Sequence, residues 1–170
     1  MNYTSCPTRV VNAPVELVWA LLTRPEGWGD FYNVRITALD PAGPAAVGQT
    51  VFAESGPRPL HLKIEFRFTQ IDASNYRLRF DARFPFGITV SEDMTCVSLG
   101  QEQCRVNYQC GFGFPPGWRG AIVHFLVRHR LDAGPADSIA RLQREAERLH
   151  AQSRSMPGPP VSQEVKEPIQ

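Results

Sequence analysis

Three stretches between Leu60 and Phe114 alternate hydrophobic and polar residues with a period of two. They cover residues 60–69, 76–84 and 104–114. Because successive side chains of a strand point to opposite faces, each stretch predicts a strand with one apolar and one charged face. The apolar positions are all even-numbered: Leu62, Ile64, Phe66, Phe68, Tyr76, Leu78, Phe80, Ala82, Phe84, Cys104, Val106, Tyr108, Cys110, Phe112 and Phe114. Such strands, joined by short loops, form an antiparallel sheet with one face in water and one covered.

The remaining pattern predicts four more strands and several helices. Strands are expected at residues 8–12, 34–39, 49–55 and 88–99. Between the first two of these, two short helices are expected, one after Pro14 and one over 25–32. The first is supported by apolar residues that recur at helical spacing, namely Val15, Val18, Trp19 and Leu22.

A long C-terminal helical region follows Pro115-Pro116-Gly117. One apolar face begins with Trp118 and continues past residue 140. Pro135 interrupts this pattern, because a proline cannot donate the hydrogen bond that a helix interior needs. Either one long helix bends there, or a second helix starts with Pro135 in its first turn.

This order of elements predicts an α+β helix-grip fold. A curved antiparallel sheet of about seven strands would wrap around the long C-terminal helix, with two short helices after the first strand. We expect residues 1–152 to form a single ligand-binding domain. Residues 153–170 turn to Ser, Pro, Gly and charged residues, and are expected to be a disordered tail.

Composition narrows the function classes. The chain has 170 residues, a net charge of +1 and 42% hydrophobic residues, which suits one soluble domain. The charge gives no reason to expect nucleic acid as a partner. No apolar run approaches the roughly 20 residues of a bilayer span, so no stable membrane insertion is expected. The start of the chain does not resemble a signal peptide, which predicts a cytoplasmic protein.

Metal binding is not expected from the cysteines or histidines. Cys6, Cys96, Cys104 and Cys110 have no C-x-x-C spacing, and no pair of histidines has metal-ligand spacing with a carboxylate. We therefore predict neither a metal nor another cofactor. An uncovered edge of the sheet could support a homodimer.

A curled sheet held by one helix predicts a cavity between them, with a mostly aromatic wall. A filled core without a cavity is the alternative. The expected lining residues come from the inner sheet face and the C-terminal helix: Phe66, Phe68, Tyr76, Phe80, Phe84, Val90, Met94, Tyr108, Phe112, Trp118, Ile122 and Phe125.

Glu92 is the first candidate for chemistry in this cavity. It shares the inner face with Val90 and Met94, so its carboxylate is expected to point at apolar surface. Burial would raise its pKa and make it an acid or base near neutrality. Alternatively, a bulge turns Glu92 outward, or a buried cation pairs with it.

His129 and Tyr108 are the other tentative catalytic residues. His129 lies on the same helical stripe as Trp118 and could serve as acid, base or hydrogen-bond donor. The alternative is a histidine that caps a packed face near a helix end. The hydroxyls of Tyr108 and Tyr76 could orient a ligand oxygen, unless they are core tyrosines whose hydroxyls reach water.

The start of the C-terminal helical region also mixes an aromatic residue with cations. Trp118, Arg119, Arg128 and Arg130 could let this helix touch a membrane while a lipid is loaded. A solvated helix flank is the simpler alternative.

The run from Val11 to Leu22, VNAPVELVWALL, resembles the opening of the START/Bet v 1-like (SRPBCC) superfamily, in particular its bacterial polyketide cyclase/dehydrase and lipid-transport group. Trp28 with Phe31, and Val47-Gly48 before a strand, are also similar. So is Leu142 with Glu145-Ala146-Glu147. The resemblance covers about residues 8–152. It implies a hydrophobic ligand such as a lipid, a sterol, a polyketide or an isoprenoid quinone. It does not imply a catalytic residue set, because some members catalyse cyclisation or dehydration and many only carry a ligand.

Three functions remain open at this stage. We favour a binding protein that holds a hydrophobic small molecule, such as a lipid, a polyketide or an isoprenoid-like compound. The alternative is an enzyme of the polyketide cyclase/dehydratase type, in which Glu92 with Tyr108 or His129 moves a proton. The third is a protein–protein module with a collapsed pocket. Two titratable groups within hydrogen-bond reach inside the cavity would favour the enzyme, and a cavity lined only by carbon would favour the carrier.

Overall fold

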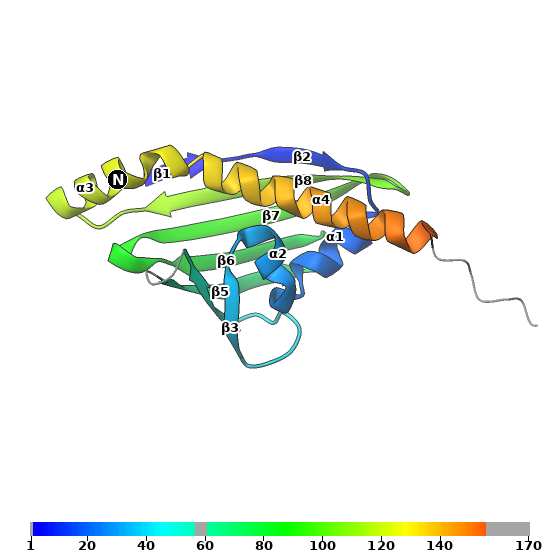
Figure 1. The fold of residues 1–170 in the computed structure, drawn as a ribbon, viewed down its shortest axis with the longest axis horizontal. Coiled ribbons are helices and arrows are strands. Elements are labelled where there is room, and N and C mark those ends of the chain that lie inside the picture. Colours follow the sequence, from blue (N-terminus) through cyan, green and yellow to red (C-terminus); the bar gives the residue numbers. More distant parts are fainter. Residues whose placement is uncertain (1, 57–60, 156–170) are drawn as a thin grey trace, which may run out of the picture.

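A computed structural model describes residues 2–56 and 61–155, and it confirms the α+β helix-grip fold (Figure 1). The strands are β1 (Asn2–Ser5), β2 (Thr8–Val11), β3 (Arg35–Asp40), β4 (Thr50–Ser55), β5 (Leu62–Asp72), β6 (Arg77–Arg83), β7 (Thr89–Gly100) and β8 (Gln103–Gly113). The α-helices are α1 (Val15–Leu22), α2 (Gly29–Tyr32), α3 (Trp118–Val127) and α4 (Ala133–Ser155). Three short 3₁₀ helices join them: η1 (Pro25–Trp28), η2 (Pro85–Gly87) and η3 (Arg128–Arg130).

The sheet is antiparallel, with the order β1-β8-β7-β6-β5-β4-β3, and β2 also pairs with β8. Strand β1 was not predicted, because Asn2-Tyr3-Thr4-Ser5 shows no alternation of apolar and polar residues. It pairs with the end of β8, where Ser5 lies opposite Cys110. The Tyr3 hydroxyl donates a hydrogen bond to the Asp132 carboxylate, which ties β1 to the turn before α4.

The even-numbered residues of the long strands face inward together, as predicted. In the register of the sheet, Phe68 lies opposite Phe80, Phe80 opposite Glu92, and Glu92 opposite Cys110. All four side chains are buried. Antiparallel pairing keeps opposed residues on one face, so Glu92 is carried to the inner face by its neighbours and not turned outward by a bulge.

The segment η1–α2 places a large aromatic residue against this inner face. Trp28 is fully buried, and its ring lies 5.0–5.6 Å, centroid to centroid, from the rings of Phe66, Phe68 and Phe80. Its indole N–H donates to the Leu22 carbonyl at 3.0 Å, so burial leaves no polar atom of Trp28 unpaired. Part of the inner face is therefore covered by this segment and not by the terminal helix.

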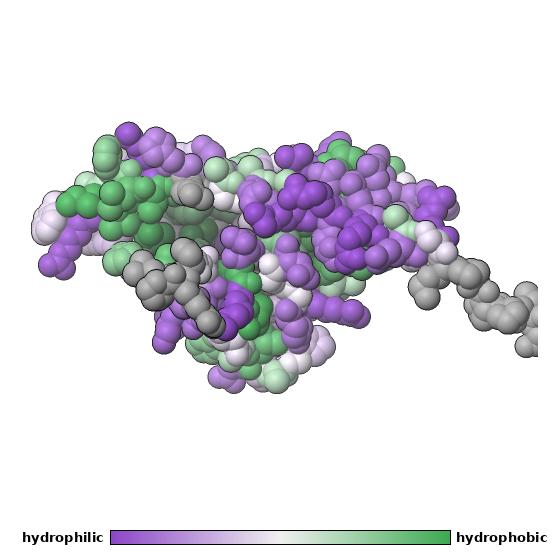
Figure 2. Space-filling model, viewed as in Figure 1, coloured by the Kyte–Doolittle hydropathy of each residue, from purple (hydrophilic) through white to green (hydrophobic). Residues whose placement is uncertain are grey.

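Helix α4 lies alongside α1, α2 and β2, and its outer side is hydrophilic (Figures 1 and 2). It starts at Ala133, which decides between the two predicted arrangements in favour of a second helix. Pro135 then falls in the first turn, where the backbone N–H groups have no intrahelical partner anyway. Its buried positions are Pro135, Ile139, Leu142 and Ala146.

The helix continues to Ser155, three residues into the predicted tail, and residues 156–170 lie outside the described part of the chain. The disordered tail therefore stays a prediction. No helix within residues 2–56 and 61–155 is long and apolar enough to cross a membrane.

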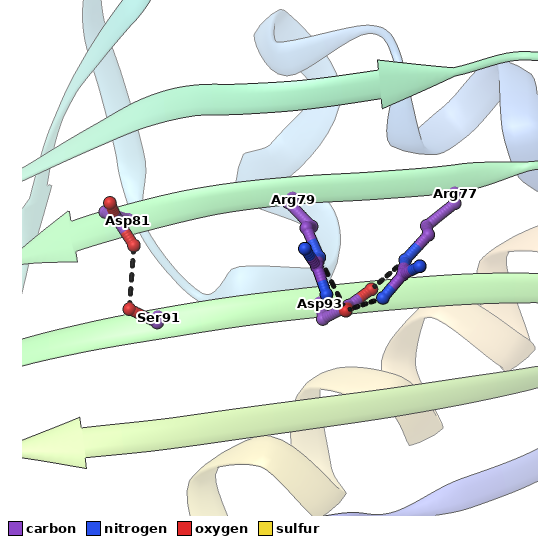
Figure 3. Close-up of polar contacts among 5 residues, drawn as sticks. All are labelled: Arg77, Arg79, Asp81, Ser91 and Asp93. Carbon is purple, nitrogen blue, oxygen red and sulfur yellow. Dashed lines mark hydrogen bonds and ion pairs between the residues drawn. The ribbon is translucent and has the colours of Figure 1, made fainter.

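The outer face of the sheet carries charged side chains that pair across strands (Figure 3). The Asp93 carboxylate accepts hydrogen bonds from Arg77 at 2.6 Å and from Arg79 at 2.7 Å, and these bonds lower its pKa. The Ser91 hydroxyl donates to Asp81 at 2.8 Å. Arg77 and Arg79 are thus paired with Asp93 on a charged, solvated face, as the alternating pattern indicated.

Candidate functional site

A cavity of about 340 Å³ lies between the inner face of the sheet, α2 and the start of α4. Its wall combines aromatic and aliphatic side chains with a small number of polar groups. The lining residues are Tyr32, Asn33, Val34, Ser55, Ile64, Phe66, Phe84, Ile88, Val90, Glu92, Tyr108, Cys110, Phe112, Val127, Leu131, Gly134, Pro135, Asp137 and Ser138. A mostly apolar hollow with a few convergent polar atoms is typical of a small-molecule site.

Glu92 is the centre of the polar part of this wall. Its side chain is 5% exposed. The Tyr32 hydroxyl donates to Glu92 Oε2 at 3.2 Å, and the Tyr108 hydroxyl donates to the same oxygen in a shorter contact. The other oxygen, Oε1, has no hydrogen-bond partner among the described residues and is not a fully buried atom. One oxygen is therefore held by two tyrosine hydroxyls, and the other has no partner among the described residues.

Burial raises the pKa of Glu92 from its usual value of 4.5 to about 7, although the hydrogen bonds from Tyr108 and Tyr32 act in the opposite direction. Burial, followed by the charge of the Glu92 carboxylate, holds the pKa of both tyrosine hydroxyls well above 10. Both tyrosines are thus neutral donors at physiological pH, and Glu92 is the group in this cluster that can change charge there.

Six residues predicted from the sequence meet in the cavity: Phe66, Phe84, Val90, Glu92, Tyr108 and Phe112. Three other predicted lining residues, Phe68, Phe80 and Met94, face inward but lie in the filled core. The rings of Phe68 and Phe80 pack on Trp28, so no space remains there for a ligand. The prediction was right about the face of the sheet and wrong about how far the cavity extends along it.

Tyr76 does not line the cavity either. It precedes β6, in the turn after β5, and has a positive φ of 47°. The strand alternation therefore does not direct its side chain. Its ring packs edge-on against Trp19, and its hydroxyl donates to Glu16 at 3.2 Å.

The predicted contribution of the first C-terminal helix is wrong. Trp118, Ile122 and Phe125 project into solvent from α3, and His129 is exposed in η3. A helical apolar stripe identifies a face but not the surface that covers it. Here α3 lies past the end of β8, and the cavity receives only Val127 and Leu131 from this part of the chain.

Tyr32 is the functional candidate that the sequence reasoning missed. It ends α2, after which Asn33 adopts the left-handed conformation with φ 55° and turns the chain towards β3. The available signal was an aromatic residue with a polar tip at the end of the Trp28–Tyr32 segment. Nothing in that local pattern indicated that its hydroxyl would meet Glu92, which lies 60 positions later.

No group of three or more His, Cys, Asp or Glu side chains within residues 2–56 and 61–155 is arranged to hold a metal ion. Cys6, Cys96, Cys104 and Cys110 are free thiols, and all but Cys6 are buried. Among the described lining residues, Glu92 and its two tyrosines form a hydrogen-bonded cluster that can donate, accept and transfer protons.

Solved structures with the same fold come from several organisms. A point mutant of norcoclaurine synthase from Thalictrum flavum, in complex with a transition-state analogue, matches with a TM-score of 0.66 and 14% identity over 91% of this chain and 98% of that one. The ZhuI aromatase/cyclase from Streptomyces sp. R1128 matches with a TM-score of 0.66 and 16% identity, over 87% of this chain and 95% of that one. A protein from Thermobifida fusca matches with a TM-score of 0.63 and 20% identity, over 86% and 94%. At these identities the similarity shows the fold alone.

The sequence itself carries a family signature. No curated protein matches the chain. A family model described as polyketide cyclase / dehydrase and lipid transport matches residues 7–147, which is most of the chain and includes β2 through most of α4. The chain therefore belongs to the polyketide cyclase/dehydrase and lipid-transport family, the group that its sequence was found to resemble.

Proposed function

We propose that the cavity binds a hydrophobic small molecule with a carbonyl or hydroxyl oxygen, and that Glu92 transfers a proton to or from it. One observation carries this proposal. Glu92 is buried in an apolar cavity with a pKa of about 7, and one of its carboxylate oxygens is free of protein partners among the described residues. A general acid or base is most effective when its pKa is near the working pH.

The walls support the hydrophobic part of the ligand. Phe66, Val90 and Phe112 offer carbon surface from β5, β7 and β8, and Phe84 adds to it from the residue that follows β6. A volume of about 340 Å³ is at the lower end of the range for small-molecule sites. This favours a compact ring system, such as a polyketide-derived one, over a long-chain lipid.

The proposed chemistry is an intramolecular ring closure. Glu92 Oε1 takes a proton from the carbon next to a ligand carbonyl, and the electrons of that C–H bond form an enolate. The enolate carbon attacks a second carbonyl of the same molecule, which forms a C–C bond and an alkoxide. Glu92 returns the proton to the alkoxide, so the product is an isomer of the substrate. Loss of water would then give the unsaturated ring, and no electrons are exchanged with another molecule.

The two tyrosines act on Glu92 in this scheme. Both donate to Oε2, which fixes the orientation of the carboxylate and directs Oε1 at the ligand. Their hydrogen bonds also favour the charged carboxylate and so limit the rise in its pKa. In this proposal Tyr108 and Tyr32 are positioning residues, whereas His129 has no role.

A carrier without chemistry is the second candidate, and the apolar majority of the wall supports it. In that case Glu92 would only anchor the ligand oxygen by a hydrogen bond. The family description names both cyclase/dehydrase activity and lipid transport, so membership of the family is consistent with either candidate. The predicted cytoplasmic location and homodimer stay predictions.

Two bicyclic probes separate these functions. β-Naphthol reports binding, measured by calorimetry. α-Tetralone reports proton transfer, since its carbon-bound protons next to the carbonyl exchange in heavy water and can be followed by NMR. We expect wild type to bind the naphthol and to catalyse exchange, and Glu92→Gln to slow exchange by about a hundredfold or more. Glu16→Gln is the matched control, because Glu16 also accepts from a tyrosine hydroxyl but lies outside the cavity.

Naphthol binding with exchange at the background rate would overturn the enzyme and leave the carrier. Undiminished exchange in Glu92→Gln would show that another group moves the proton. If neither probe binds, and Ser138→Phe on the helical wall of the cavity lowers the thermal stability because the larger side chain finds no space, the cavity is closed in solution and both candidates fail.

A further inference from the structure

Helix α3 carries an apolar surface that no described part of the chain covers. Trp118, Ile122, Phe125 and Leu126 are 70%, 50%, 59% and 70% exposed. We refer to these four residues as the α3 apolar face. Figure 2 shows hydrophobic colour gathered at this end of the molecule. Single exposed apolar residues are ordinary, but four on ten helical residues form a contiguous patch that indicates an interaction site.

The geometry of α3 explains why these side chains point outward. At 3.6 residues per turn they fall within an arc of about 100°. The opposite side is held by the protein: Gly120 is buried against Pro115, where a Cβ atom would lie 1.8 Å from the Pro115 carbonyl oxygen. His124 packs edge-on against the Phe114 ring at 5.1 Å between centroids. The helix is therefore fixed by its inner side and presents its apolar side to solvent.

A further exposed aromatic residue, Phe86, lies near α3. Phe86 in η2 is 74% exposed and has a positive φ of 65°. Such a backbone conformation is unfavourable for a bulky residue, and observed strain of this kind is more common at functional sites. A Cβ on the next residue, Gly87, would lie 3.0 Å from Pro115, so η2 packs against the residues that lead into α3. Phe86 is thus an exposed aromatic residue near the start of α3.

The charged residues of α3 and its flanks have one sign. Between Gln103 and Leu131 the sequence contains no Asp or Glu, and the next acid along the chain, Asp132, accepts a hydrogen bond from Tyr3. Arg119 and Arg128 lie at the two borders of the apolar arc. The Arg119 guanidinium is 5.7 Å from the Trp118 ring centroid, and that of Arg128 is 4.4 Å from the Phe125 ring centroid. An apolar stripe with aromatic residues and a cation at each border is the pattern of a helix that lies in the surface of an anionic bilayer.

We propose that the α3 apolar face and Phe86 dock the protein on an anionic lipid surface. A second copy of the chain fits less well. A two-fold contact through α3 would bring Arg119 and Arg128 of the two copies together, and α3 carries no acidic residue to pair with them. A lipid surface satisfies both features at once. Its acyl region accepts the aromatic side chains, and its phosphates accept the arginines.

The position of this surface connects it to the cavity. Val127 and Leu131, which follow the α3 apolar face in the chain, line the cavity, and so do Phe84 and Ile88 on either side of η2. A ligand that partitions into the bilayer could thus reach the cavity at the docked end. This last step rests on the proposed function, but docking does not.

The test is flotation of the full chain with vesicles of phosphatidylcholine alone and of phosphatidylcholine mixed with phosphatidylglycerol. We expect wild type to float with the mixed vesicles and about tenfold less with the neutral ones. The double substitution Phe125→Ser with Leu126→Ser should weaken binding to mixed vesicles by about tenfold or more. Arg119→Gln should weaken it by about fivefold. The matched control is Val97→Ser with Leu99→Ser, which changes two exposed apolar residues at the far end of β7 and should leave binding unchanged.

Fluorescence of Trp118 provides a readout that needs no variant. Trp118 is exposed, whereas Trp28 is fully buried and Trp19 is half-buried against Tyr76, so mixed vesicles should shift the wild-type emission to shorter wavelength through Trp118. Absence of flotation, equal flotation with both vesicle types, or full binding by the double variant would each overturn the proposal. A wild-type dimer that the double substitution converts to a monomer would overturn it in favour of a second copy. Flotation requires neither the cavity nor Glu92, so this proposal and the proposed function can fail separately.

Discussion

The inner face of the sheet has two halves that differ in what covers them. In one half, Trp28 packs on Phe68 and Phe80 and fills the space completely. In the other half, residues of β5, β7 and β8 face the cavity around Glu92. Strands β5 and β7 run through both halves, since Phe68 and Met94 lie in the filled half and Phe66 and Glu92 line the cavity, so the difference does not come from the sheet.

The covering segments make the difference. The filled half receives an indole ring from η1, whereas the open half receives the start of α4, where Gly134, Pro135 and Ser138 are small. A void beside apolar side chains costs stability, because the lining atoms lose contacts that a larger residue would supply. Two ways of covering one face thus give a core that stabilises the domain and a cavity that is available for a ligand.

The largest expected effect is a difference in stability when one aromatic side chain in each half is replaced by alanine. Trp28→Ala should lower the free energy of unfolding by about 3–5 kcal/mol, because it removes a fully buried ring and a hydrogen bond to Leu22. Phe84→Ala, in the wall of the cavity, should cost less than about 2 kcal/mol, because its ring is only half-buried. Chemical denaturation measures both values.

The two variants should behave in the opposite way towards β-naphthol. Phe84→Ala should weaken its binding by about tenfold, whereas Trp28→Ala, or the milder Trp28→Phe where alanine prevents folding, should leave it within about twofold. If Trp28→Ala and Phe84→Ala lost equal amounts of stability, the comparison would fail, because the cavity half would then be packed as tightly as the core.

The second prediction uses pH to test the burial of Glu92. Its pKa is about 7 in the folded protein and near 4.5 when exposed, so the folded state binds the proton more tightly. The stability that this proton contributes is complete below about pH 4.5 and is lost as the pH rises to about 7. The loss should amount to about 3 kcal/mol. Glu92→Gln should flatten this part of the stability profile, as measured by denaturation between pH 4.5 and 8. A profile unchanged by the substitution would mean that Glu92 is solvated.

Period-two alternation was enough to predict the long strands and the face to which their residues point. Even-numbered residues of four long strands face inward, and this pattern alone carried Glu92 to the cavity. The prediction worked because a strand has only two faces, so one buried neighbour decides the orientation of the next-but-one residue. Strand β1 was missed for the same reason, because its residues do not alternate between apolar and polar.

Helices and turns were harder to place, because their local pattern does not name the surface that they contact. The apolar stripe of α3 was assigned to the cavity, although Gly120 fixes the opposite side of that helix against Pro115. The sequence placed Trp28 in the expected short helix over 25–32 and in the family resemblance, but did not indicate that this residue decides where the cavity ends. Tyr32 meets Glu92 through the tertiary fold alone. The boundary between the filled and open halves was therefore out of reach of the sequence.

The third prediction compares two tyrosines that donate to a glutamate at the same distance of 3.2 Å. Tyr32→Phe removes a donor to the buried Glu92, so the pKa of Glu92 should rise further and the pH profile of α-tetralone exchange should move up by about one pH unit. Tyr76→Phe removes a donor to Glu16, outside the cavity, and should leave the profile unchanged. A purely structural role for Tyr32 would lower the rate at all pH values and leave the position of the profile where it is.

The smallest expected effect concerns His129, which the helical stripe placed in the cavity and the structure places in solvent. If proton transfer is confined to the open half of the sheet, His129→Gln should change α-tetralone exchange by less than about twofold, since the cost of removing a general acid or base is a hundredfold or more. The variant should also keep the stability of the wild type, because an exposed side chain contributes little to it. A tenfold slower exchange at unchanged stability would show that η3 closes over the cavity when a ligand is bound. In that case η3 would cover the open half when a ligand is bound, and the contrast with the half filled by Trp28 would hold only for the protein without a ligand.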